Sequence, residues 1–217
     1  ISRANPRSQP FFFVRCAQFG NNMMAVPKIL RVDGSARYGE SVSRALTDHA
    51  VAAFQREIGL INLTQRDLRN GIGNISSVWR EASLALDEVR SQEHRAILAQ
   101  SEALSSEVKK AHLLLIAAPI YNFAIPAALK SWIDMICRDN VDGGRARCPS
   151  IPAKAKQAMI ITTSNYTRVD GKDNFATPYL IFMLNFIGIT KITIIDATGM
   201  ADNQAEVVAR AKDTISD

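Results

Sequence analysis

Cysteine and histidine are both scarce in this chain of 217 residues, which has three of each. The cysteines, Cys16, Cys137 and Cys148, are too few and too far apart for a disulfide framework or a Cys-x-x-Cys metal site. The histidines form neither an HExxH motif nor a cluster with cysteine, so no metal site is predicted. So little cysteine is typical of a protein in a reducing compartment, and we predict a cytoplasmic location.

Long apolar runs and concentrated positive charge are also missing. No run approaches the ~18 apolar residues of a transmembrane helix, so no membrane span is predicted. The 26 basic and 21 acidic residues give a net charge of +5. The basic residues are scattered without interleaved aromatic residues, which argues against nucleic-acid binding. A composition of 47% hydrophobic and 22% charged residues suits one ordinary globular domain with a sizeable core.

Residues 1–24 differ from the rest, and we predict an N-terminal extension there, followed by a single domain over residues 25–217. The extension contains no acidic residue, three arginines and an apolar run at residues 11–14, which are features of a targeting segment. The chain begins with Ile1, and Met23 and Met24 precede the first predicted strand. An expression remnant or upstream readthrough is therefore the preferred interpretation, with a targeting segment or a native packing arm as alternatives.

From residue 26 onward, strand-like and helix-like segments alternate without an internal repeat or a linker, which is typical of an α/β domain. Five such units predict a doubly wound five-stranded parallel sheet with strand order 2-1-3-4-5. The strands are predicted at residues 28–32, 59–63, 112–118, 157–163 and 191–196. The helices are predicted at residues 42–56, 92–110, 127–138, 178–187 and 203–215. An irregular or helical excursion is predicted at residues 64–91 and a long loop at residues 139–156.

The most informative segment, residues 117–132, joins a buried apolar strand to an amphipathic helix through an aromatic loop bracketed by Pro119 and Pro126. The loop follows the carboxyl end of a central strand, where open α/β sheets bind ligands. Its central residues offer a surface for a flat ring and a polar group for a heterocycle edge; they are Ile120, Tyr121, Asn122 and Phe123. The alternative is that these aromatic residues anchor the loop in the core.

The exit of the first strand, the serine loop at residues 33–44, is rich in hydroxyl groups and runs directly into a helix. Free N–H groups and the positive dipole end at a helix start attract anions, and Ser35, Ser41 and Ser43 add hydroxyl donors, so the loop is a candidate phosphate site. It has neither a Walker motif nor GxGxxG, which argues against ATP hydrolysis and a dinucleotide-type site. The simpler alternative is that Ser41 only caps the helix.

The serine loop and the aromatic loop leave strands that adjoin in the predicted sheet. A mononucleotide would satisfy both loops, with its phosphate at the first and its ring at the second. Flavin mononucleotide (FMN) fits better than a sugar phosphate because the second loop supplies aromatic side chains and an amide.

With these residues in view, the chain resembles the family of FMN-dependent NADH-azoreductases and quinone reductases over residues 26–215. The resemblance is carried by Ser35, Ser41-Val42-Ser43, the segment APIYNFAIPAALKSWID, Thr177-Pro178-Tyr179-Leu180 and Phe186-Ile187-Gly188-Ile189. It implies a flavodoxin-like fold and a homodimer with active sites at the interface. It also implies the transfer of two electrons from NADH or NADPH through FMN to a quinone or azo compound. Since donor and acceptor would use one face of the flavin in turn, we expect ping-pong kinetics.

By position, the resemblance assigns cofactor contacts to three loops. The phosphate contacts are Ser35, Ser41, Val42 and Ser43. The ring contacts are Pro119, Ile120, Tyr121, Asn122 and Phe123. The third loop contributes Ser164, Asn165, Tyr166 and Thr167. No catalytic side chain is expected, because FMN itself carries the chemistry.

Two departures from the family pattern bear on specificity. The third loop usually reads Ser-Arg-Gly-Gly, and side chains here replace glycines that would let the backbone approach the flavin closely. Binding of the flavin ring, the space for the acceptor or the preference for NADH or NADPH is therefore expected to differ from that of relatives. Tyr166 is either a stacking or lid residue or an exposed loop tyrosine. Residues 140–143 also lack the aromatic residue that relatives commonly place near the flavin.

Other readings remain open at this point. A flavodoxin-like binding or regulatory module with a degenerate, weakly active flavin site is the main alternative, favoured by the altered third loop. An electron carrier is disfavoured because the net charge is positive. Lys130 and Asp134 are interpreted as a surface ion pair. Three arginines are candidate docking charges for a nicotinamide cofactor, and the sequence does not choose among Arg37, Arg44 and Arg168.

Overall fold

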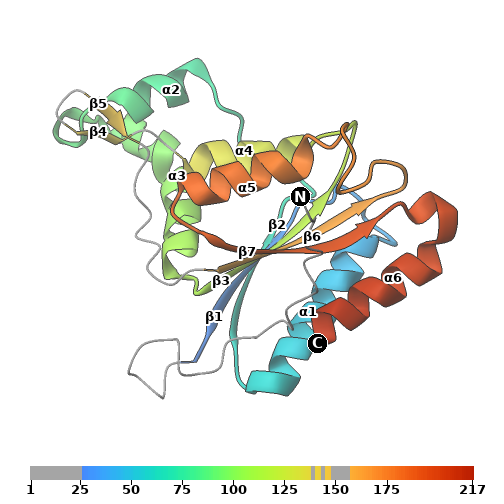
Figure 1. Ribbon diagram of the computed structural model, residues 1–217. Coiled ribbons are helices and arrows are strands. Elements are labelled where there is room, and N and C mark those ends of the chain that lie inside the picture. The colour runs from blue at the N-terminus through green and yellow to red at the C-terminus, as the bar shows by residue number, and fades with distance from the viewer. Residues whose placement is uncertain (1–25, 138–139, 143–144, 148–156) are drawn as a thin grey trace, which may run out of the picture.

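A twisted parallel sheet runs through the centre of the computed structural model, which describes residues 26–137, 140–142, 145–147 and 157–217 (Figure 1). Its five strands have the spatial order β2-β1-β3-β6-β7, and every neighbouring pair is parallel. Counted along the chain as parallel strands, this is the order 2-1-3-4-5, so the predicted fold class is confirmed. The strands are β1 Lys28–Asp33, β2 Asn62–Asp67, β3 Leu113–Pro119, β6 Gln157–Ser164 and β7 Lys191–Thr198.

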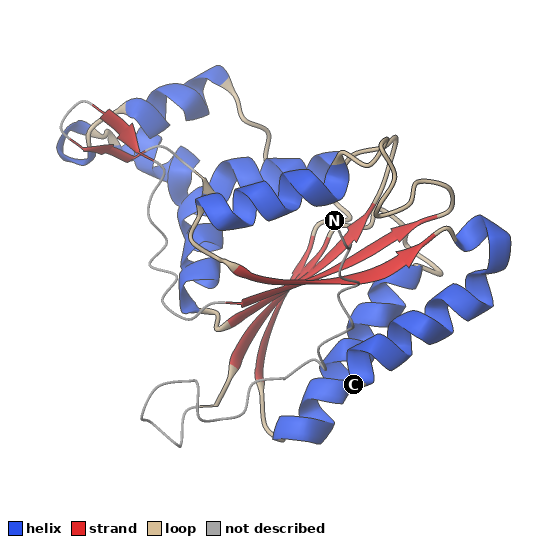
Figure 2. Cartoon of the chain, in the orientation of Figure 1, coloured by secondary structure: helices blue, strands red, loops and turns tan. Residues whose placement is uncertain are grey.

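Helices cover both faces of the sheet (Figure 2). One face carries α1 (Val42–Ile58) and α6 (Met200–Ser216). The other carries α3 (Gln92–Lys110), α4 (Ala127–Ile136) and α5 (Ala176–Phe186). A smaller unit projects beside the start of α3; it consists of α2 (Ser77–Leu84), η2 (Asp87–Val89) and the paired strands β4 (Asn140–Asp142) and β5 (Arg145–Arg147) (Figure 1).

The central strands are buried on both faces, which explains their near-continuous apolar sequence. Successive side chains alternate between the two layers. Leu114 and Ile116 of β3 pack in the core under α3, α4 and α5, whereas Leu113 and Leu115 pack in the core under α1 and α6. The carboxyl ends of all five strands therefore meet at one edge, with their loops held by two packed layers.

The predicted second strand at residues 59–63 is wrong in its position, because β2 begins at Asn62 and ends at Asp67. Gly59 instead ends α1 with a positive φ of 77°, which glycine adopts readily. As an edge strand, β2 has exposed or half-buried side chains and carries no apolar signal. Four residues assigned to the excursion at 64–91 belong to this strand, and the rest of that excursion includes α2 and η2.

The predicted loop at residues 139–156 is wrong where the structure describes it, since β4 and β5 pair there as antiparallel strands. Three-residue strands are too short to show a periodic pattern. Helix boundaries shift by a few residues, most at α6, which begins at Met200 rather than at residue 203. The predicted extension at residues 1–24 and the remainder of the loop, residues 139, 143–144 and 148–156, lie outside the described residues.

Across the part of the chain that the structure describes, no helix has the length and apolar character needed to cross a membrane. Within the same residues, no group of three His, Cys, Asp or Glu side chains is arranged to hold a metal ion.

Candidate functional site

A cleft of about 810 Å³ opens where the loops after β1, β3, β6 and β7 meet. Every site residue predicted from the sequence lines this cleft: Ser35, Ser41, Val42, Ser43, Pro119, Ile120, Tyr121, Asn122, Phe123, Ser164, Asn165, Tyr166 and Thr167. Four further residues line it as well: Arg37, Thr163, Met200 and Gln204. Segments far apart in the sequence are thus gathered at the carboxyl edge of the sheet, as this topology requires.

The serine loop ends at the start of α1 in a form that suits an anion. Ser41 occupies the N-cap position with extended backbone angles, but its hydroxyl makes no capping hydrogen bond and lies 3.2 Å from the Ser43 hydroxyl. The alternative that Ser41 serves only as a side-chain cap is therefore wrong. The first helical bond runs from Ala45 N–H to the Ser41 carbonyl, so the preceding N–H groups of the first turn stay outside the helical ladder. That turn contains no acidic residue.

The serine loop and the aromatic loop touch each other directly. Gly34 N–H donates to the carbonyl of Ala117 at 2.9 Å, and a Cβ atom at Gly34 would lie only 2.7 Å from that oxygen. The Ser35 hydroxyl lies 3.4 Å from the hydroxyl of Tyr121. A larger residue at Gly34 would thus push the start of the serine loop away from the end of β3.

The aromatic loop is a strained turn. Tyr121 and Ala124 exchange backbone hydrogen bonds at 2.9 and 3.1 Å, and between them Asn122 and Phe123 adopt φ of 47° and 69°. Such positive φ values are unfavourable for a phenylalanine. Tyr121 is 36% exposed and Phe123 is 52% exposed, whereas Ile120 is buried. The alternative that both aromatic residues anchor the loop in the core is therefore wrong.

The third loop is fixed at its base and open at its tip. Thr167 N–H donates to the Ser164 hydroxyl at 3.1 Å, and the Asn165 carbonyl accepts from Ala201 N–H of α6 at 3.1 Å. Tyr166 is 83% exposed at the cleft. Its side chain is therefore exposed at the cleft, while the backbone of the loop is held by hydrogen bonds.

Met200 and Gln204 line the cleft from either side of a kink in α6. Asn203 has the non-helical angles φ −157° and ψ 88°, and its Oδ1 accepts from Glu206 N–H at 3.2 Å as a second N-cap. A new helical segment thus starts at Gln204 beside the cleft. Neither Met200 nor Gln204 was predicted as a site residue from the sequence, although a helix that follows a parallel strand always begins at this edge.

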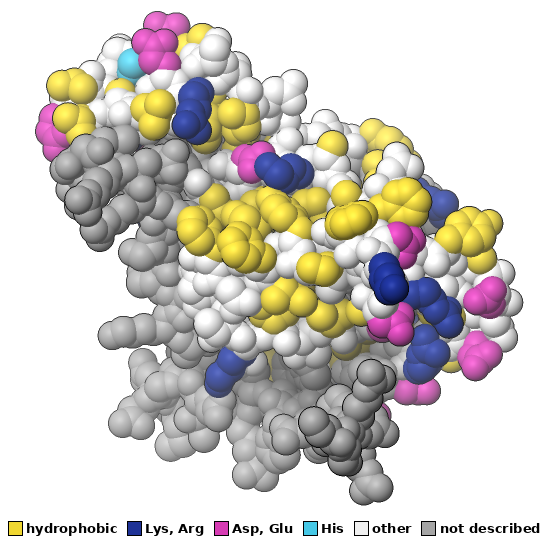
Figure 3. Space-filling view, turned by 45° about the horizontal axis from the view of Figure 1, so that its top comes forward, with side chains coloured by type: hydrophobic (Ala, Val, Ile, Leu, Met, Phe, Trp, Pro, Cys, Tyr) yellow, Lys and Arg dark blue, Asp and Glu magenta, His cyan; other side chains and the backbone are white. Residues whose placement is uncertain are grey.

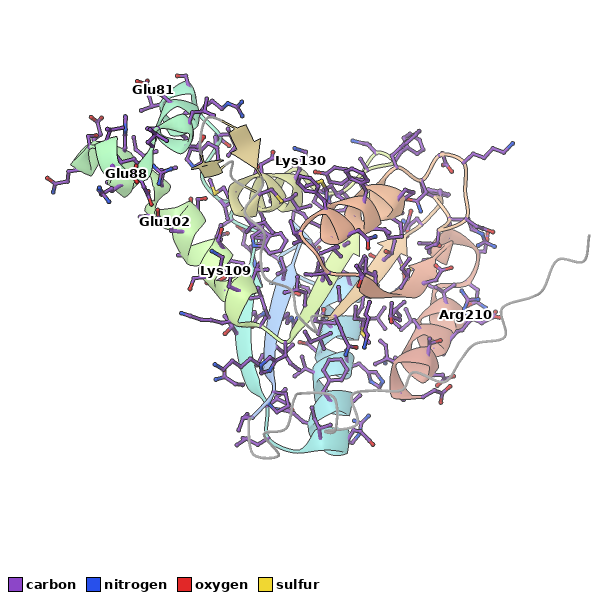
Figure 4. The ribbon with its side chains drawn as sticks, turned by 60° about the vertical axis from the view of Figure 1, so that its left-hand side comes forward. Glu81, Glu88, Glu102, Lys109, Lys130 and Arg210 are labelled. Atoms are coloured by element: carbon purple, nitrogen blue, oxygen red, sulfur yellow. The ribbon has the colours of Figure 1, made fainter. Side chains whose placement is uncertain are left out.

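An apolar groove of about 660 Å³ adjoins the cleft, and Tyr121 and Asn122 line both. Lys130 of α4, labelled in Figure 4, and Tyr179 of α5 lie along the groove. Lys130 Nζ donates to Asp134 at 2.6 Å, and this hydrogen bond raises the pKa of Lys130. Burial raises the pKa of Tyr179. The predicted Lys130–Asp134 surface pair is confirmed, and a lysine held in its charged form by a carboxylate is a poor general base.

Comparison with known proteins gives consistent results. A family model described as flavodoxin-like fold matches residues 27–217. The chain is 37% identical over 193 residues to a protein named FMN-dependent NADH:quinone oxidoreductase 1 from Colwellia psychrerythraea, covering 86% of this chain and 97% of that protein. It is 36% identical over 171 residues to an FMN-dependent NADH:quinone oxidoreductase from Thiobacillus denitrificans, covering 78% of this chain and 83% of that protein.

Solved structures share the fold at lower sequence identity. An FMN-dependent NADH-azoreductase from Bacillus anthracis, solved in complex with FMN, matches with a TM-score of 0.76 and 19% identity. The match covers 88% of this chain and 96% of that chain. At this identity the likeness supports the arrangement of strands and helices alone.

Proposed function

The chain belongs to the flavodoxin-like family that includes the FMN-dependent NADH:quinone oxidoreductases, and from this membership we propose that it is an FMN-dependent oxidoreductase. It takes two electrons from NADH or NADPH and passes them to a quinone or an azo compound. One observation carries the proposal: a single cleft joins a helix start suited to phosphate with an aromatic turn suited to a flat ring.

The residues of the cleft fit FMN in both size and chemistry. A volume of about 810 Å³ lies within the range of about 300–1,000 Å³ that is usual for cofactor sites. Ser35, Ser41 and Ser43, with the N–H groups of the first turn of α1, would hold the phosphate. The aromatic loop and the third loop would hold the ring, since both lie at the same cleft and present backbone as well as side-chain groups.

When bound, FMN supplies the two-electron chemistry, and the protein positions it and shapes the opening. Phe123 and Tyr166 are both exposed where they line the cleft. Because the structure gathers both side chains at one cleft, we infer that donor and acceptor occupy the same space in turn. This is the basis for ping-pong kinetics. The relatives' names specify NADH, and NADH is the donor we expect to be preferred.

A homodimer is part of the proposal, because a large apolar surface lies next to the cleft. Phe175, Phe182 and Phe186 of the α5 region are 65%, 66% and 55% exposed, and the last two rings stack with centroids 6.3 Å apart. Figure 3 shows hydrophobic side chains gathered on this side of the molecule. Phe175 also lines the groove that adjoins the cleft. Exposed apolar patches of this kind mark interfaces, so a second copy would cover the groove and border the site.

The experiment uses one cuvette. Purified protein is saturated with FMN, desalted and examined by its absorbance spectrum, and then titrated anaerobically with NADH or NADPH before a quinone is added. We expect retained flavin, bleaching with stoichiometric nicotinamide cofactor, and recovery of the oxidised spectrum with the quinone. A protein that retains no FMN would contradict the proposal.

The second candidate function is a binding or regulatory module with a weakly active flavin site. One observation favours it: the third loop carries Asn165, Tyr166 and Thr167 at the mouth of the cleft, with the Tyr166 side chain protruding. The same experiment separates the two, because failure to retain FMN on desalting would favour such a module, whereas retained flavin that is bleached by NADH or NADPH and restored by the quinone would favour the enzyme.

A further inference from the structure

A network of buried charges lies directly beneath the serine loop. Asp33, at the end of β1, is fully buried. Its carboxylate accepts hydrogen bonds from Arg31 Nε at 2.8 Å and from Gln65 Nε2 at 2.8 Å. Arg31 itself is buried and also pairs with Asp48 of α1. These residues face α1, so the polar network replaces apolar packing between β1 and the first turns of that helix.

Arg44, in the first turn of α1, connects this network to Ser35 of the serine loop. Its side chain is only 12% exposed. Its Nη2 donates to the carbonyl of Ser35 at 2.7 Å and to Asp67 Oδ1 at 2.6 Å, and its Nη1 lies 3.4 Å from Asp33 Oδ2. Within the described residues its Nε is buried and makes no hydrogen bond. A buried arginine with an unused donor is costly compared with a hydrophobic side chain, so stability alone does not explain it.

The same network extends through Asp67 and Arg69 to Tyr38, in the middle of the serine loop. Asp67 accepts hydrogen bonds from the backbone N–H of Arg69 at 2.9 Å and from its side chain at 2.7 Å. The Arg69 guanidinium lies 5.5 Å from the centroid of the Tyr38 ring, and the Tyr38 hydroxyl donates to Asn70 Oδ1 at 2.7 Å. Burial alone would raise the pKa of Asp67, but hydrogen bonds from Arg44 and Arg69 hold that pKa well below its usual range.

Two observations show what Arg44 does for the cleft. It is absent from the residues that line the cleft, although its neighbours Val42 and Ser43 are among them. Its positive charge is already matched by the carboxylates of Asp33 and Asp67. Arg44 therefore pairs with carboxylates outside the cleft, and its direct contact with the part of the loop that lines the cleft is the carbonyl of Ser35.

We propose that Arg44 is a positioning residue for the phosphate end of the cofactor site. By fixing the Ser35 carbonyl against the first turn of α1, it holds the Ser35 hydroxyl and the start of the loop in the orientation that a phosphate requires. It does so without contacting the phosphate. This inference rests on the proposed function, because it concerns the same site and the same cofactor.

The test compares FMN with riboflavin, which lacks the phosphate, as ligands of the wild-type protein and of three variants. Arg44→Met removes the hydrogen bonds and the charge, whereas Arg44→Lys keeps the charge but loses the planar, multiple donors. Arg66→Met is the matched control, since Arg66 is an arginine of the adjacent strand β2 that pairs with Glu107 of α3 instead. Dissociation constants are measured by quenching of flavin fluorescence, and folding is followed by thermal unfolding.

We expect both Arg44 variants to weaken FMN binding by about 10- to 100-fold, the range that follows from losing hydrogen bonds to a charged group. Riboflavin binding should stay close to that of the wild type, so the ratio of the two affinities falls. Arg66→Met should leave this ratio unchanged. If Arg44→Met does not fold, Arg44→Lys decides alone by the same ratio.

Two outcomes would overturn the inference while the proposed function stands. Wild-type FMN affinity in Arg44→Lys would show that charge, not geometry, is what matters. Equal losses for FMN and riboflavin in both variants would show a purely structural role. A wild-type protein that binds neither flavin would instead remove the proposed function, and the inference with it.

Discussion

The serine loop and the aromatic loop line the same cleft and leave neighbouring strands, yet they are held by opposite means. The serine loop rests on a buried charge network that reaches its backbone through Arg44. The aromatic loop is a tight turn closed by two backbone hydrogen bonds, with two residues at positive φ and two exposed aromatic rings. The serine loop is held in place by the ion pairs and hydrogen bonds beneath it. The aromatic loop is held by its own two backbone hydrogen bonds, in a conformation that strains two of its residues.

The difference follows from what each loop is expected to hold. A phosphate must be met by donors fixed in place, because reorganising polar groups around an anion costs free energy at the moment of binding. A flat ring needs apolar surface and a few backbone groups in register, which a strained turn can present. A substitution in one loop should therefore weaken binding of its own part of the cofactor and leave the other part's binding unchanged.

Ser41→Asp should have the largest effect. A carboxylate at the start of α1 would repel a bound phosphate by about 4 kcal/mol if the charges lie ~4 Å apart at a partly buried site, which weakens FMN binding by about 100- to 1,000-fold. Aspartate is a good N-cap and interacts favourably with the helix dipole, so the melting temperature should not fall. Isothermal titration calorimetry measures the affinity for FMN, and thermal unfolding measures the melting temperature.

The matched control is Ser41→Asn, which has a similar shape and capping ability but no charge. It should bind FMN far better than Ser41→Asp. Equal binding by the two variants would mean that the phosphate does not lie at this helix start.

Phe123→Gly should instead weaken the contact between the aromatic loop and the flavin ring. Removing one exposed aromatic contact is expected to cost about 1 kcal/mol or somewhat more, or roughly a tenfold loss of affinity for both FMN and riboflavin. The ratio of the two affinities should not change. Because glycine relieves the φ of 69° at this position, the protein should not lose thermal stability.

Leu60→Gly serves as the control, since it also removes a large exposed apolar side chain but at a position outside the cleft and the groove. It should bind both flavins as well as the wild type. A selective loss of FMN binding in Phe123→Gly would contradict the assignment of this loop to the ring.

Asp67→Asn tests how much the ion pairs beneath the serine loop contribute to the free energy of unfolding. The folded-state pKa of Asp67 is depressed below 3.8, so its contribution is fully present above the unfolded pKa and is lost as the pH falls through the folded pKa. The variant should therefore be less stable than the wild type by about 1–2 kcal/mol at pH 7, the difference shrinking below about pH 4. Urea unfolding at pH 7 and pH 3 measures this, and a difference that grows on acidification would rule out the assigned ion pairs.

Tyr166→Ala should have the smallest effect on the folded protein and on the cofactor. Its side chain is 83% exposed, so stability should change by less than about 0.5 kcal/mol. With the side chain removed from the opening, the ratio of kcat/KM for a bulky azo acceptor to that for a small quinone should rise. An unchanged ratio would mean that Tyr166 is an exposed loop residue with no part in acceptor choice.

The parts of this fold that could be predicted from sequence are those where burial leaves a strong pattern. The central strands β1, β3 and β6 are apolar because both faces are covered, and their positions were predicted within a residue or so. The edge strand β2 has almost no buried side chain, so its pairing with β1 left no periodic signal. The short strands β4 and β5 were missed for a related reason, since each has only three residues.

The site, too, has parts that could be predicted from the sequence and parts that could not. Its three loops were predictable because each directly follows a recognisable strand, and the topology brings such loops together. Gln204 was not predicted as a site residue, because its position in the sequence does not show that its side chain lines the cleft. The charge network beneath the serine loop was not either, because it joins Asp33, Arg44 and Gln65 across three separate elements. Such pairings depend on tertiary register, which residue spacing does not reveal.

The most direct test of the account is a crystal structure of the protein grown with FMN. We expect the phosphate within hydrogen-bonding distance of the Ser35, Ser41 and Ser43 hydroxyls at the start of α1. We expect the ring against residues 120–123, with the third loop on its other border. A phosphate held by the third loop, or a flavin bound outside this cleft, would contradict the central claim that one cleft has a phosphate end and a ring end supported in different ways.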